Sequence, residues 1–135
     1  KEFIDLRNKN LSKSSSINFI ELNSCNLINH KKKYDLIWID GAHGYPVVCM
    51  DIINSLHLIN TNGLIMLDDV CPHLKYSTSD KMYSSIASYE TLKELEKQNL
   101  IKLNLIYKRL EAKYNCLEKQ RKYVAIFTKL YSYFL

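Results

Sequence analysis

The sequence predicts a layered α/β fold. Two continuously apolar stretches, residues 36–39 and 64–67, are typical of strands buried on both faces of a parallel sheet. Between them, apolar residues recur every three or four positions, which predicts an amphipathic helix. Further stretches with helix and strand patterns follow in the second half of the chain, as expected when helices pack on a sheet.

Size and composition predict a single domain over residues 1–135 with a real core, because 47% of the residues are hydrophobic. The net charge of +5 comes without a nucleic-acid-binding motif, so we expect no nucleic-acid interface. No apolar run is long enough to cross a membrane, and there is no signal peptide. None of the four cysteines forms a CxxC pair, which favours reduced thiols in a cytoplasmic protein.

The amino-terminal part predicts a helix, a linker and a strand. Residues 1–7 have the pattern of a helix already under way, and the first residue is Lys, so the chain is expected to be a fragment of a longer protein. Residues 8–16 form a polar linker. Residues 17–22 are predicted as a short strand, and residues 23–26 as a turn.

The predicted helix between the two buried strands begins near Pro46, which suits a first helical turn. It is expected to end in a turn over residues 60–63, with Asn62 or Gly63 as a left-handed cap. One apolar face is formed by Val48, Ile52, Leu56 and Ile59.

The carboxyl-terminal part predicts one more helix and two strands. The helix covers residues 81–98, with apolar members at helical spacing. Residues 103–107 and 123–128 are predicted strands, joined by a charged connection.

Acidic residues follow both buried strands. Asp40 ends the first strand, and Asp68 and Asp69 end the second. Ligands of open α/β sheets bind at the carboxyl ends of the strands, so three carboxylates are expected to converge there. Their repulsion, about 4 kcal/mol for one pair near 4 Å, must be offset by protonation, by separation or by a cation. Three carboxylate oxygens with waters suit hard cations such as Mg²⁺, Mn²⁺ or Ca²⁺. His43 lies three residues beyond Asp40 and is suited to act as a general base.

Simpler interpretations exist for each of these residues. Asp68 and Asp69 can be solvated or capping residues at a strand end, and His43 can serve a loop hydrogen bond. Trp38 is expected in the core. The other histidines are expected on the surface or on helix faces: His30, His57 and His73.

The stretches 34–45 (YDLIWIDGAHGY) and 60–70 (NTNGLIMLDDV) resemble the fourth and fifth strands of class I S-adenosylmethionine-dependent methyltransferases. The likeness is greatest to metal-assisted O-methyltransferases of small molecules with an IDGxH loop. It implies a Rossmann-like sheet whose final two strands are antiparallel, and methyl transfer to a small-molecule hydroxyl.

The resemblance also assigns residue roles. Asp40, Asp68 and Asp69 match the metal ligands, with Mg²⁺ as the expected ion, and His43 matches the catalytic base. The methyl donor would contact three residues: Asn23, Ser24 and Asp40.

The sequence lacks two features of this family. No GxG follows a first strand, and the first two strands of the family order 3-2-1-4-5-7-6 have no counterpart. The sheet is therefore expected to be incomplete, and the chain alone to bind S-adenosylmethionine weakly or not at all. To close the gap, residues 17–22 would pair with residues 36–39, or the chain would pair with a second copy.

Three functions remain open from the sequence. The first is an enzyme with a small-molecule acceptor, acting as a homo-oligomer or with a missing amino-terminal half. The second is an inactive methyltransferase-fold remnant that serves as an interaction module. The third, a phosphoacceptor receiver domain, is disfavoured because its acidic pair would precede the single aspartate.

Overall fold

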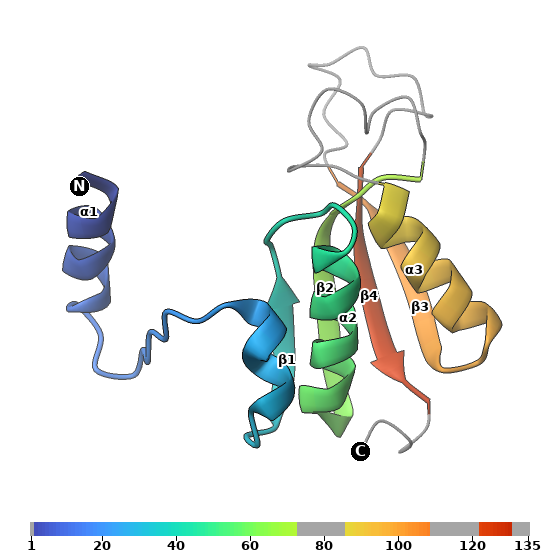
Figure 1. Ribbon diagram of the computed structural model, residues 1–135, viewed down its shortest axis with the longest axis horizontal. Coiled ribbons are helices and arrows are strands. Elements are labelled where there is room, and N and C mark those ends of the chain that lie inside the picture. The colour runs from blue at the N-terminus through green and yellow to red at the C-terminus, as the bar shows by residue number, and fades with distance from the viewer. Residues whose placement is uncertain (1, 73–85, 109–121, 131–135) are drawn as a thin grey trace, which may run out of the picture.

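The computed structural model describes residues 2–72, 86–108 and 122–130, in which helices pack on a mixed sheet (Figure 1). In chain order the elements are α1 (Glu2–Leu11), the 3-10 helix η1 (Ser24–Asn29), β1 (Tyr34–Ile39), α2 (Val47–Leu58), β2 (Ile59–Val70), α3 (Ile86–Lys97), β3 (Ile101–Tyr107) and β4 (Tyr123–Lys129). No helix within these residues is both long and apolar enough to cross a membrane.

The strands lie in the order β1-β2-β4-β3. β1 and β2 are parallel, and Trp38 lies beside Met66 in their register. β4 is antiparallel to both β2 and β3, so the predicted antiparallel pairing of the last two strands is confirmed. Because α2 connects two parallel strands, the carboxyl ends of β1 and β2 meet at one edge of the sheet.

α2 is amphipathic, as predicted. Val48, Ile52 and Leu56 are fully buried. Pro46 directly precedes the first helical residue, where the missing N–H of proline removes no helical hydrogen bond. The regular spacing of these side chains therefore fixes which side of α2 faces the sheet.

The predicted turn after this helix is wrong. α2 ends at Leu58, and β2 begins at Ile59 with no intervening loop, so residues 60–63 lie within the strand. Gly63 is not a left-handed cap, because no glycine of the chain has a positive φ. The β-branched Ile59 suits an extended backbone, which explains an earlier start of the strand.

The core lies between the sheet and the two helices α2 and α3, which stand in front of the same face of the sheet in Figure 1. Alternate residues of β1, β2 and β4 point into it, as the period of two requires. From the sheet these are Ile39, Ile65, Leu67, Ala125 and Phe127, all buried. α3 contributes the buried Leu92; residues 81–85 of the longer predicted helix lie outside the described part of the chain.

The opposite face of β1 is exposed. Leu36 is 59% exposed and Trp38 is 50% exposed. The predictions that residues 36–39 are buried on both faces and that Trp38 belongs to the core are therefore wrong. The strand itself is present, but within the described residues helices cover only one of its faces.

Residues 17–22 do not form a strand. Their apolar side chains, including Ile17 and Phe19, are exposed, and the described sheet ends at β1. The prediction that this segment pairs with β1 within one chain is therefore wrong. Pairing through a second copy stays a prediction. The predicted amino-terminal helix is confirmed as α1, which has no buried residue and stands apart from the sheet in Figure 1.

Candidate functional site

The loop between β1 and α2 carries Asp40 and His43 at the carboxyl edge of the sheet. Asp40 directly follows β1 and is largely exposed, whereas His43 is only 2% exposed. Nε2 of His43 lies 3.9 Å from Oδ1 of Asp40, which is longer than a hydrogen bond. The two predicted residues are thus brought together, with the imidazole packed against protein and the carboxylate facing water.

The environment of His43 favours a neutral imidazole. Burial lowers the pKa of His43, against the opposing effect of Asp69, Asp40 and Asp68, and the net shift is downward from 6.5. Nδ1 is buried and has no hydrogen-bond partner among the described residues. A neutral imidazole offers one nitrogen lone pair, which is what a proton acceptor requires.

Asp68 and Asp69 lie at the end of β2, where the strand departs from regular geometry. The register with β4 shifts between Leu67 and Val70, and Asp69 has a φ of 53°, in the left-handed region. The backbone N–H of Asp69 donates to Oδ1 of Asp68 at 2.8 Å. Aspartate tolerates this backbone conformation better than most residues do, which places both carboxylates at one irregular corner.

Two lysines pair with these aspartates. Nζ of Lys108 lies 2.5 Å from Oδ2 of Asp68 and 2.8 Å from Oδ1 of Asp69. Nζ of Lys122 lies 3.1 Å from Oδ2 of Asp69. These four residues are named the aspartate–lysine cluster below.

The pKa shifts follow these contacts. Burial acts to raise the pKa of Asp69, but hydrogen bonds from Lys108 and Lys122 outweigh it, and the net shift is downward from 3.8. Burial acts to lower the pKa of Lys108, but Asp68 and Asp69 outweigh it, and the net shift is upward from 10.5. Asp69 is therefore ionised and Lys108 protonated at neutral pH.

The geometry does not support the predicted metal shell. No group of three or more His, Cys, Asp or Glu side chains among residues 2–72, 86–108 and 122–130 is arranged to hold a metal ion. Ammonium groups already contact both carboxylates of the pair, where a hard cation would need oxygen lone pairs. The assignment of Asp40, Asp68 and Asp69 as metal ligands stays a prediction without structural support.

Asn23 and Ser24 make contacts that shape η1. The side-chain carbonyl of Asn23 accepts a hydrogen bond from the backbone N–H of Cys25 at 3.0 Å, as an amino-terminal cap. The backbone carbonyl of Ser24 accepts from the buried Asn54 of α2 at 2.9 Å. These contacts fix η1 against α2, and a role of the two residues in donor binding stays a prediction.

Sequence reasoning missed both lysines and one carboxylate. Lys108 follows β3 and Lys122 precedes β4, positions that an antiparallel pair beside β2 brings to the edge where Asp68 and Asp69 lie. Asp51 of α2 has a buried Oδ1 with no described hydrogen-bond partner, and its other oxygen lies against Gly41 of the histidine loop. In the sequence, Asp51 stands out as a charged residue between the apolar positions 48 and 52 of the predicted helix, and a charged residue in such a position is uncommon.

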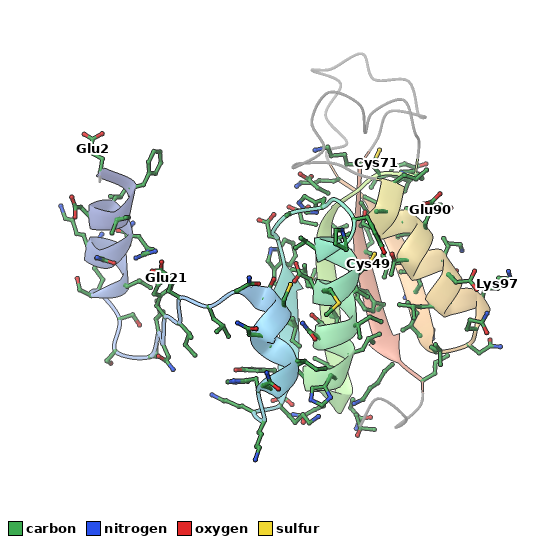
Figure 2. All side chains as sticks on the ribbon, viewed as in Figure 1. Glu2, Glu21, Cys49, Cys71, Glu90 and Lys97 are labelled. Carbon is green, nitrogen blue, oxygen red and sulfur yellow. The ribbon has the colours of Figure 1, made fainter. Side chains whose placement is uncertain are left out.

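A pocket of about 460 Å³ lies between α3 and the start of α2. Two of its lining residues, Cys49 and Thr91, are joined by a hydrogen bond, with Sγ and Oγ1 3.0 Å apart. Figure 2 shows Cys49 and Glu90 on these two neighbouring helices. The pocket is lined by Tyr45, Cys49, Ala87, Glu90, Thr91, Glu94 and Leu95.

Sheet order and helix placement define a methyltransferase-type Rossmann-like fold, and two comparisons agree. The family model described as "Methyltransferase domain" matches residues 5–70, just under half of the chain. The crystal structure of precorrin-6y C5,15-methyltransferase from Geobacter metallireducens GS-15 is similar, with a TM-score of 0.57 at 14% identity. The match covers 95% of this chain and 62% of that chain. No curated protein matches the sequence. Together these findings show a methyltransferase-type Rossmann-like fold, and the chain spans less than two thirds of the length of the similar structure.

Proposed function

We propose that this chain is part of an S-adenosylmethionine-dependent methyltransferase that methylates a hydroxyl of a small molecule. The observation that carries the proposal is the buried, neutral His43 beside Asp40 at the carboxyl edge of β1. The match to a methyltransferase domain over residues 5–70 supports the use of this donor.

The donor, when bound, supplies an electrophilic methyl group on a sulfonium sulfur. Asn23, Ser24 and Asp40 are the residues expected to contact it. Only part of a donor site is present, because none of the three glycines forms the GxG loop that would hold the methionine end. We therefore propose that this chain supplies the residues that act on the acceptor hydroxyl.

His43 would take the proton from the acceptor hydroxyl as its oxygen attacks the methyl group. Its lowered pKa keeps the imidazole unprotonated at neutral pH, and burial shields it from bulk water. Asp40, 3.9 Å from Nε2, would then stabilise the imidazolium that forms. No step through a divalent metal belongs to this proposal, because lysines occupy the aspartate pair.

The test is transfer of labelled methyl groups from millimolar S-adenosylmethionine to a panel of small hydroxyl compounds. We expect the His43→Gln variant to lose at least about 100-fold in rate, the usual contribution of a general base. A matched control is His57→Gln, which changes a histidine outside the proposed site. Transfer that is equally fast in His43→Gln would refute the assignment of His43, and donor binding without transfer to any acceptor would favour the inactive interaction module.

A further inference from the structure

The aspartate–lysine cluster is built into the fold. Lys108 and Lys122 are joined through their backbones, because the N–H of Lys108 donates to the carbonyl of Lys122 at 2.9 Å. This bond continues the pairing of β3 and β4 one step beyond Tyr107 and Tyr123. The two ammonium groups therefore lie at the corner of the sheet next to the end of β2.

Every carboxylate oxygen of the aspartate pair accepts a hydrogen bond. Oδ1 of Asp68 accepts from the backbone of Asp69, and its Oδ2 accepts from Lys108. For Asp69, Oδ1 accepts from Lys108 and Oδ2 from Lys122. A divalent cation would have to displace these donors and would meet two positive charges within the same few ångströms.

We infer that Lys108 and Lys122 are the resident cations of this corner, and that they exclude a divalent metal from Asp68 and Asp69. Their two positive charges balance the two carboxylates without any ion from solution. The inference concerns cation binding and does not require that the chain transfers methyl groups. Its failure can therefore be told apart from failure of the proposed function.

The experiment is a titration of the full chain with Mn²⁺, followed by the loss of the free-ion electron paramagnetic resonance signal. The wild-type chain is expected to bind Mn²⁺ no tighter than about 1 mM, the range of weak carboxylate sites. The double variant Lys108→Gln/Lys122→Gln exposes both carboxylates without the competing charge. It is expected to bind at least about tenfold tighter, and a further Asp69→Asn change should abolish the gain.

The control is Lys93→Gln/Lys97→Gln, which removes the same charge from ion pairs on the exposed side of α3. Micromolar binding by the wild-type chain that disappears in Asp69→Asn would overturn the inference. So would a cluster variant that binds Mn²⁺ no better than the control. If the double variant does not fold by circular dichroism, Lys122→Gln alone must show part of the gain, and the wild-type titration decides independently.

Discussion

A histidine sealed inside a protein responds to acid through the stability of the fold. His43 is 2% exposed, and the net effect of its surroundings is to lower its pKa below 6.5. The unfolded chain therefore takes up a proton at a pH where the folded chain does not. Protonation of His43 on acidification therefore favours the unfolded state, even though three nearby aspartates partly oppose the lowering of its pKa.

We predict that stability declines as the pH falls below about 6.5, by at most about 1.4 kcal/mol per pH unit from His43 alone. The loss continues down to the folded pKa of His43, below which both states bind the proton. Urea unfolding at pH 7.5 and pH 5.5 measures it, with His43→Gln as comparison. The decline should be smaller in the variant, and equal declines would contradict the prediction.

The second residue-scale prediction concerns Asp69. Its folded pKa lies below 3.8, so its contribution is present above that pH and is lost as the pH falls through the folded value. Replacing Asp69 removes the carboxylate to which the partly buried Lys108 and Lys122 donate. Asp69→Asn should cost about 1–3 kcal/mol of unfolding free energy at pH 7. Chemical denaturation checks this, and Glu94→Gln on exposed α3 should change little.

At the scale of elements, the join between α2 and β2 depends on a missing side chain. A Cβ at Gly63 would lie 2.6 Å from Cγ1 of Ile59 and 3.0 Å from the backbone carbonyl oxygen of Asp35. Ile59 is fully buried and cannot swing into solvent. The close approach of β1 to the start of β2 therefore requires glycine at this position, for space and not for an unusual φ.

Gly63→Ala is predicted to destabilise the chain by about 1–3 kcal/mol through overpacking. Thermal or urea unfolding measures the loss. Gly41→Ala is the matched control, because a Cβ there would have its nearest contact at an ordinary 3.7 Å. Equal stability of the two variants would show that Ile59 can move aside.

α2 and its flanking strands could be predicted because their signals are local. The spacing of Val48, Ile52 and Leu56 defines a helix face without knowledge of the rest of the chain. Residues 17–22 have an equally apolar pattern, yet a strand exists only where another strand pairs with it. The apolar pattern of β1 also could not reveal that the face with Trp38 is exposed. Burial of that face depends on whether another element packs against it.

The candidate site was predictable in part for the same reason. Asp40 and His43 are three residues apart in one loop, so their proximity follows from the sequence. Lys108 is 40 residues from Asp68, and Lys122 is 53 residues from Asp69. Their pairing depends on β4 lying between β2 and β3, a sheet order that the resemblance implies but residue patterns alone do not reveal.

At the scale of the whole molecule, the described sheet carries Asp40 and His43 at one edge, but none of the three glycines of the sequence forms a GxG loop. We predict that the chain alone binds S-adenosylmethionine more weakly than about 1 mM, because most of the expected donor contacts are missing. Isothermal titration calorimetry with the product S-adenosylhomocysteine and with the donor measures this. Micromolar binding would show that another part of this chain replaces the loop.

The placement of β4 has a consequence for synthesis. It is the last strand of the described sheet in chain order, yet it lies in the interior and pairs with both β2 and β3. A nascent chain therefore exposes β3 before its pairing partner has left the ribosome, and Ala125 and Phe127 reach the core last. Closure of the domain must await translation of β4, and until then the apolar inner face of β2 depends on the two helices or on a chaperone for cover.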